Sequence, residues 1–330
     1  MSQRCIYKEY ICVPLRKTLR NGGIYKMNDF SKKMNKVVYP YINKHCTKDY
    51  FYNNDGSKLR YKHYTVNNSC KSVLIIHGFS EFIDKYDEVI YNFMQAGIEV
   101  FALELRGHGY STREVNDSCL VHIDSFSKYI NDIHSFVEKY MCKEKCEKIL
   151  FAHSMGGGIG ANYIDKYPND FDKVILSSPM IKMRTGKLPY AVVINISKIM
   201  SVLGKSKKYA VGQHKFPGEN YKKDMTDRQR FYFEKRLNNP SFQTWGASYG
   251  WIKAAGENTK EISSVLKSKV KMLILIAGND DMVIPSETIK YAKRQRNAKY
   301  VLFENGMHEL FNDSKKISDQ FWSEIFEFIK

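Results

Sequence analysis

The chain has 330 residues, of which 43% are hydrophobic and 26% charged, and this balance is typical of a globular protein and excludes a disordered one. Its 52 basic and 35 acidic residues give a formal net charge of +17. A charge of this size indicates nucleic acid, an anionic membrane surface, an acidic substrate, or a lysine-rich solvated surface.

Seven irregularly spaced cysteines argue against a disulfide framework, and the pair in "CKEKC" lacks a second pair of zinc ligands nearby. We therefore expect no metal. The most apolar run, residues 190–204, is interrupted by Asn195, Ser197 and Lys198, so it does not predict a spanning helix. The first residues, "MSQRCIYKEYICVPLRK", carry too many charges for a signal peptide. We expect a cytoplasmic protein, with peripheral association at the inner membrane face as the open alternative.

Residues 1–35 are basic and match no strand or helix of a core, so we interpret them as an N-terminal extension. Beyond them, short apolar runs alternate with helical patterns, which is typical of parallel strands joined by crossover helices. The expected strands are 72–78, 98–105, 148–153, 172–178, 270–278 and 299–304. The expected helices include 84–97, 124–140, 160–167, 286–296 and 314–330. The sequence thus predicts an α/β fold with a mostly parallel central sheet flanked by helices.

The alternation stops between residues 182 and 253, a stretch too long for a plain loop. We interpret it as a helical lid inserted between a first core segment, 36–181, and a second, 254–330. From Lys182 to Arg236 this lid has fourteen basic and four acidic residues, a net charge of +10. Two explanations stay open: the charge holds a phosphate headgroup or an anionic bilayer, or it is a solvated face.

A sharp strand-to-helix turn is indicated by "LFAHSMGGGIG", residues 150–160. In the nucleophile-elbow motif G-x-S-x-G, a serine occupies this corner and only small residues fit two positions before and after it. Here Ala152 and Gly156 hold those positions around Ser154. The alternative is that Ser154 only caps the helix.

A serine nucleophile needs a base and an acid that orients the base. His308 follows the strand 299–304, and two aspartates, Asp280 and Asp281, follow the strand 270–278. We favour Asp281, because the "DMVIP" that begins there has an apolar pair and a proline where such loops turn back into a helix; Asp280 is the alternative. The order serine, acid, histidine is that of α/β-hydrolases.

An oxyanion hole needs two backbone N–H donors. The residue after the nucleophile, Met155, supplies one, and the loop after the strand 72–78 supplies the other, which assigns it to Phe79 in "HGFSE". The loop "RGHG", residues 106–109, is interpreted as a tight structural loop beside the site.

Together, "HGFSE", "ELRGHGYS", "AHSMGGG", "SPM", "GNDDMVIP" and "MHELFND" resemble the α/β-hydrolase superfamily, in particular its branch of monoacylglycerol lipases and bacterial lysophospholipases, from about residue 53 to residue 330. By this resemblance Ser154, Asp281 and His308 form the triad, with Phe79 and Met155 as oxyanion donors. Glu104 stands where the family usually has aspartate, and Ala152 where many hydrolases have glycine.

The resemblance implies a serine hydrolase that cleaves the acyl ester of a lysophospholipid or monoacylglycerol without a cofactor. The alternatives are an esterase or aminopeptidase-like enzyme on a soluble substrate, and a non-catalytic binding protein on the same scaffold. Nucleic-acid binding is not expected, because the sequence has no recognised module for it. The sequence leaves the oligomeric state open.

Overall fold

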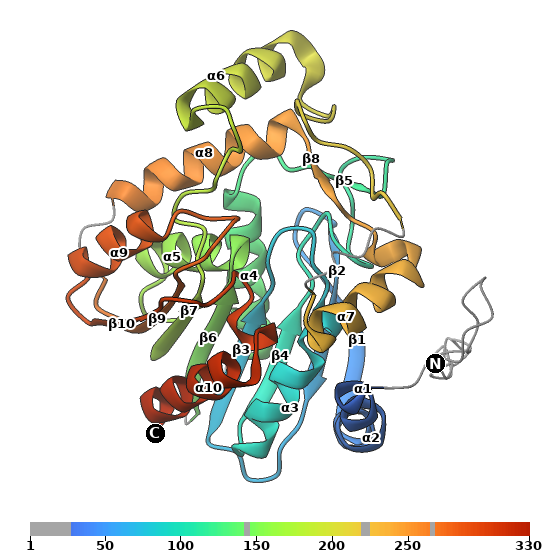
Figure 1. Cartoon of the computed structure of the whole chain (residues 1–330), viewed down its shortest axis with the longest axis vertical. Helices are drawn as coiled ribbons and strands as arrows, with labels where there is room; N and C mark the ends of the chain where they lie inside the picture. The colour runs from blue at the N-terminus through green and yellow to red at the C-terminus, as the bar shows by residue number, and fades with distance from the viewer. Residues whose placement is uncertain (1–27, 142–145, 219–224, 265–267) are drawn as a thin grey trace.

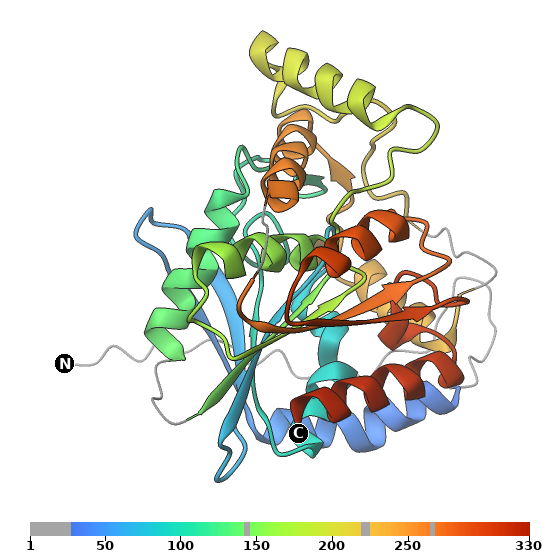
Figure 2. The same cartoon turned by 90° about the vertical axis from the view of Figure 1, so that its left-hand side faces the viewer.

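The computed structural model describes residues 28–141, 146–218, 225–264 and 268–330. A twisted eight-stranded sheet runs through the molecule in the order β1-β2-β4-β3-β6-β7-β9-β10 (Figures 1 and 2). Its strands are β1 (Cys46–Tyr52), β2 (Lys58–Tyr64), β3 (Lys71–Ile76), β4 (Glu99–Leu103), β6 (Glu147–His153), β7 (Lys173–Ser177), β9 (Lys271–Ala277) and β10 (Ala298–Phe303). The pairs β1–β2 and β2–β4 are antiparallel, and every other neighbouring pair is parallel. The predicted fold class is confirmed.

Helices cover both faces of this sheet, which is why the central strands are apolar throughout. In β3, for example, Val73, Leu74, Ile75 and Ile76 are fully buried. One face packs against α4 (Ser127–Tyr140), α5 (Met155–Lys166) and α9 (Pro285–Arg294), with α8 (Tyr249–Ser264) lying outside α5. The other face packs against α3 (Asp87–Gln95) and α10 (Lys315–Ile329), and short 3₁₀ turns, η2 (Ile83–Tyr86) and η5 (Leu310–Asn312), precede these helices.

The N-terminal segment differs from the sequence expectation. Residues 29–44 form three consecutive helical segments, α1 (Asp29–Lys33), the π-helical η1 (Met34–Val38) and α2 (Tyr39–Lys44). Phe30, Met34, Val38 and Ile42, spaced four residues apart, form one buried stripe in the core that also contains α3. The interpretation of residues 1–35 as an extension without core helices is therefore wrong from residue 29 onward. Residues 1–27 lie outside the described part.

The inserted lid consists of two spatially separate parts. Its first part, α6 (Tyr190–Met200) with η3 (Ser201–Lys205), lies outside α8 at the top of Figure 1. Its second part, α7 (Asp227–Leu237) with η4 (Pro240–Phe242), lies beside α3 and the N-terminal helices. β8 (Gly246–Ala247) then pairs with β5 (Leu120–Val121). The boundary expected at residue 253 falls inside α8.

Ion pairs fix α7 to α3. Lys235 Nζ lies 2.6 Å from Asp87, and Arg228 Nε lies 2.8 Å from Glu88. Phe30 adds an edge-to-face ring contact with Phe231, 5.5 Å between centroids. The second part of the lid is thus anchored to the core. No helix in the described ranges is long and apolar enough to cross a membrane.

Candidate active site

Ser154 lies at the corner between β6 and α5, at the carboxyl edge of the sheet where open α/β sheets hold their ligands. Its backbone has a positive φ of 53°, with ψ −118°. A Cβ on Gly156 would lie 2.6 Å from the carbonyl oxygens of Ile76 and His77, so only glycine fits there. The structure therefore has the strained elbow that the sequence predicts, and Ser154 makes no side-chain cap to the helix.

Two more serines at this edge have a positive φ. Ser80, after β3, has φ 58°, and Ser178, after β7, has φ 42°. The turns that follow three adjacent strands are therefore all strained at a serine.

His308 joins Ser154 to an aspartate. Its Nε2 lies 2.8 Å from Ser154 Oγ, and its Nδ1 lies 2.7 Å from Asp280 Oδ2. With the Asp280 carboxylate accepting from Nδ1–H, Nε2 is left free to accept the serine proton. This is the hydrogen-bond geometry of a nucleophile, a base and an acid that orients the base.

The preference for Asp281 is wrong. Its side chain is exposed, whereas Asp280 is 4% exposed and contacts His308. The reason lies in the turn: Asp280 Oδ1 accepts from the backbone N–H of Met282, at 2.8 Å, and of Val283, at 2.9 Å. The "MVIP" segment thus orients Asp280, and Asp281 points elsewhere.

Several hydrogen bonds favour the charged form of Asp280. Burial raises the pKa of its carboxyl, but the hydrogen bonds from His308, Val283 and Met282 outweigh burial and hold the pKa below its usual range. Asp280 is therefore ionised at neutral pH, as an acid that stabilises an imidazolium must be.

The expected oxyanion donors lie beside Ser154. Met155 begins α5, so its N–H has no acceptor within the helix and lies at the positive end of the helix dipole. Phe79 follows Gly78, and a Cβ on Gly78 would lie 3.0 Å from Ser154 Cβ. His77 Nδ1 contacts the Gly78 carbonyl oxygen at 2.8 Å, which holds the peptide unit that carries the Phe79 N–H.

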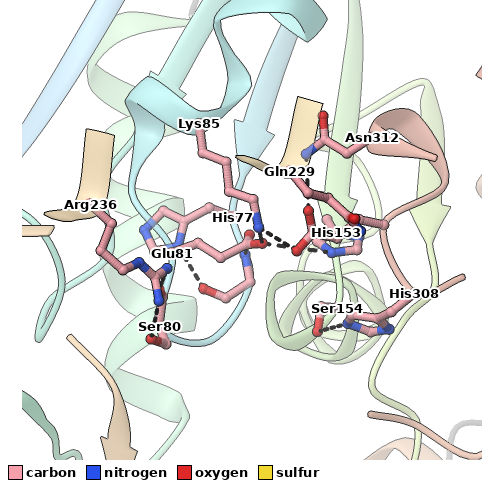
Figure 3. Close-up of polar contacts among 12 residues, drawn as sticks. His77, Ser80, Glu81, Lys85, His153, Ser154, Gln229, Arg236, His308 and Asn312 are labelled. Carbon is pink, nitrogen blue, oxygen red and sulfur yellow. Dashed lines mark hydrogen bonds and ion pairs between the residues drawn. The ribbon is translucent and has the colours of Figure 1, made fainter. Parts of the chain in front are cut away.

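A buried network of charges beside the triad was not predicted (Figure 3). Lys85 Nζ lies 2.6 Å from Glu81 Oε1 and 2.5 Å from Glu309 Oε1. Glu81 Oε2 accepts from the Gly78 N–H at 2.6 Å and from the Tyr86 hydroxyl at 2.5 Å. Lys85 thus links the loop that carries Phe79 to the loop that carries His308.

The charges of Lys85, Glu81 and Glu309 stabilise one another and so offset the cost of burying them. Burial alone would raise the pKa of Glu81 and of Glu309, but the Lys85 ammonium holds both below their usual range. The two carboxylates in turn raise the pKa of Lys85, which burial alone would lower. His153, fully buried beside them, has a pKa lowered by burial to about 4.

The RGHG loop is a structural neighbour of the site. His108 Nε2 accepts the Ser80 N–H at 3.1 Å. Glu104 is fully buried, and Oε2 accepts the Tyr110 N–H at 2.7 Å. A Cβ on Gly109 would lie 2.0 Å from the Glu104 carboxyl carbon, so this glycine makes room for the glutamate.

The lid brings apolar side chains over the site. Trp251 on α8 packs against Phe79, with 4.4 Å between ring centroids. Val193 and Ile196 of α6, with Ile252 and Tyr249 of α8, line a small hollow between these two helices. Ser154 is not among its lining residues, so the hollow belongs to the lid.

A serine, a histidine and an aspartate at the carboxyl edge of this sheet define the class of the protein, a hydrolase with the α/β-hydrolase fold. Residues 67–315 match the family described as serine aminopeptidase, S33, and the chain belongs to this family. The resemblance drawn from its motifs is confirmed.

Named relatives lie in the expected branch. The chain is 26% identical over 268 residues to a probable lysophospholipase L2 from Haemophilus influenzae, covering 79% of this chain and 84% of the relative. It is 24% identical over 269 residues to a monoacylglycerol lipase from Mycolicibacterium smegmatis, covering 79% and 89%.

A solved structure shares the fold. The soluble variant of monoglyceride lipase from Saccharomyces cerevisiae, in complex with a substrate analogue, superposes with a TM-score of 0.68 at 19% identity, covering 86% of this chain and 95% of that one.

Proposed function

We propose that the protein hydrolyses the single acyl ester of a lysophospholipid or a monoacylglycerol through an acyl-enzyme on Ser154. The observation that carries the proposal is the continuous hydrogen-bonded line from Ser154 through His308 to Asp280. The printed names of the relatives, lysophospholipase and monoacylglycerol lipase, support the substrate class.

Each step of this reaction is carried out by a named residue of the site. Ser154 Oγ attacks the ester carbonyl carbon while His308 Nε2 takes the hydroxyl proton, and the carbonyl oxygen becomes an oxyanion facing the Phe79 and Met155 N–H groups. The ester C–O bond breaks as His308 returns the proton to the leaving alcohol. Water, deprotonated by the same histidine, then attacks the acyl-enzyme, and the fatty acid leaves as Ser154 regains its proton.

The composition of the lid favours a lipid substrate over a peptide substrate. An aminopeptidase has to hold a free α-amino group, usually with carboxylates, and residues 182–236 have only four acids against fourteen bases. The lid instead places the apolar ring of Trp251 against Phe79, next to Ser154, which suits an acyl chain. These features support an ester with an acyl chain.

Labelling with a fluorophosphonate, combined with turnover, tests the proposal. Wild type should label, and Ser154→Ala and His308→Ala should not. Wild type should then hydrolyse lysophosphatidylcholine or monoacylglycerol faster than a short soluble ester or an aminoacyl nitroanilide. Faster turnover of a soluble substrate would overturn the lipid assignment. A folded wild type that neither labels nor turns over any ester would leave a binding scaffold.

We further propose that the first part of the lid contacts an anionic membrane surface. Val202 is 87% exposed, and Leu203 and Ile199 are also largely exposed. Lys198, Lys205, Lys207 and Lys208 lie exposed on the same short segment, and α6 lies outside α8, on the side away from the central sheet (Figures 1 and 2). Exposed apolar residues beside lysines suit an interface of acyl chains and anionic headgroups.

Sedimentation with vesicles tests this contact. Binding to vesicles with phosphatidylglycerol should exceed binding to phosphatidylcholine alone and weaken with salt. Replacing Val202 and Leu203 by aspartate should abolish it, while Val37→Asp, an exposed apolar residue on η1, should not. Equal binding of both variants, or no binding by wild type, would contradict the proposal.

A further inference from the structure

The turn that carries the expected oxyanion donor is strained. Phe79 lies between Gly78 and Ser80, and Ser80 has a left-handed backbone with φ 58°. A strained residue keeps such a conformation only when its surroundings hold it there. The groups that hold Ser80 therefore decide where the Phe79 N–H points.

Ser80 is held through all of its polar atoms. Its N–H donates to His108 Nε2 at 3.1 Å, and its hydroxyl donates to the Thr244 carbonyl. The third contact comes from α7 of the lid: Arg236 Nη2 donates to the Ser80 carbonyl, and Arg236 Nη1 lies 3.4 Å from the Ser80 hydroxyl. Figure 3 shows the guanidinium pointing directly at Ser80.

Arg236 is an unusual cation. It is 9% exposed, and in the part of the chain that the structure describes it forms no ion pair with a carboxylate. Its guanidinium lies 5.3 Å from the ring centroid of Trp245 and 5.8 Å from that of Phe82. A buried charge is costly, and within the described residues the hydrogen-bond acceptors of this guanidinium belong to one serine, in the loop next to Ser154.

We propose that Arg236 is a positioning residue of the reaction, which holds the Ser80 carbonyl so that the Phe79 N–H points at the oxyanion. The inference rests on the proposed function and adds that the inserted lid, besides covering the site, completes it. The ion pair of the neighbouring Lys235 with Asp87 keeps α7 in the place from which Arg236 reaches the loop.

Kinetics of Arg236→Ala on a short soluble ester test the proposal. A displaced oxyanion donor costs transition-state stabilisation, so kcat should fall about ten- to a hundred-fold while KM changes little. The affinity of a boronic acid inhibitor, which forms a tetrahedral adduct on the serine, should fall by a similar factor. Millimolar guanidinium should restore part of kcat by filling the vacated space, and an equal concentration of urea should not.

Arg228→Ala is the matched control. It removes another α7 arginine and its ion pair with Glu88, but the Lys235–Asp87 ion pair still holds α7 and Ser80 is untouched, so its kcat should stay at the wild-type value. If Arg236→Ala does not fold, Arg236→Lys decides, because one ammonium cannot reproduce the two-atom contact and should still lower kcat.

The possible failures are distinguishable. A wild type without activity or fluorophosphonate labelling overturns the proposed function, and this inference with it. An active wild type with an equally active Arg236→Ala overturns the positioning role alone. So does a loss that Arg228→Ala shares, or one that guanidinium does not relieve.

Discussion

Replacing Asp280 by asparagine tests which aspartate orients His308. The amide cannot stabilise an imidazolium, and it offers an N–H where His308 Nδ1 needs an acceptor 2.7 Å away. Loss of this carboxylate from a serine triad costs about 10⁴ in kcat, roughly 5 kcal/mol of transition-state stabilisation. The asparagine Oδ1 can still accept from Met282 and Val283, so the turn should keep its shape.

The assay is the initial rate on a soluble ester, with thermal unfolding to show that the variant is folded. Asp281→Asn is the matched control, and because its side chain is exposed we expect a change in kcat within about twofold. The reasoning is refuted if Asp281→Asn loses activity as Asp280→Asn does. It is also refuted if folded Asp280→Asn keeps more than a small fraction of the wild-type rate.

Three further changes probe the packing and charges around the site. Gly156→Ala should lower the free energy of unfolding by about 2 kcal/mol or more, because the new Cβ would lie 2.6 Å from backbone oxygens. Gly186→Ala is its control and should cost about 1 kcal/mol, because the space there is open and only the positive φ is strained. Urea denaturation measures both. Burial lowers the pKa of His153 from its ordinary 6.5 to about 4, so between these two pH values the unfolded chain binds a proton at His153 and the folded chain does not. The free energy of unfolding should therefore fall by about 3 kcal/mol as the pH drops from above 6.5 to about 4. His153→Asn should remove that slope in denaturation at successive pH values. Lys85→Met should destabilise by about 3 kcal/mol or more at neutral pH, measured in the same way, because it leaves the buried Glu81 carboxylate and the partly buried Glu309 carboxylate without their cation.

Each change has a result that would contradict its premise. Equal losses for the two glycine variants would mean that the elbow has room for a methyl group. An unchanged slope in His153→Asn would assign the acid sensitivity to other groups. A stable Lys85→Met would mean that its carboxylate partners reach water.

Continuous apolar runs predicted β3, β4, β6, β7 and β9, because both faces of these strands are buried, and they also predicted β10, which lies at the edge of the sheet with Tyr300 and Leu302 exposed. β1 and β2 were not predicted, because "CTKDYFY" and "KLRYKHY" interleave lysines and tyrosines and form no apolar run. The apolar stripe shared by α1, η1 and α2 was also missed, because it is embedded in a basic stretch.

Motif order found Ser154 and His308, because each follows a strand at a sharp turn. The choice between adjacent aspartates depended on which carboxylate the Met282 and Val283 N–H groups hold, and that is a property of the turn. The bond from Lys85 to Glu309 joins residues 224 positions apart, and that from Arg236 to Ser80 joins residues 156 apart. No local pattern in the sequence marks such pairs.

The three serines with a positive φ imply a trade-off between heat resistance and catalysis. Glycine adopts this conformation freely, so replacing any of these serines by glycine would relieve strain. At Ser178, whose buried hydroxyl has no partner within the described residues, Ser178→Gly should raise the melting temperature and spare the chemistry. At Ser154 the same substitution would remove the proposed nucleophile. Selection for thermostability alone would therefore first replace the strained serines at the carboxyl edge of the sheet, where the fold is less stable than it could be.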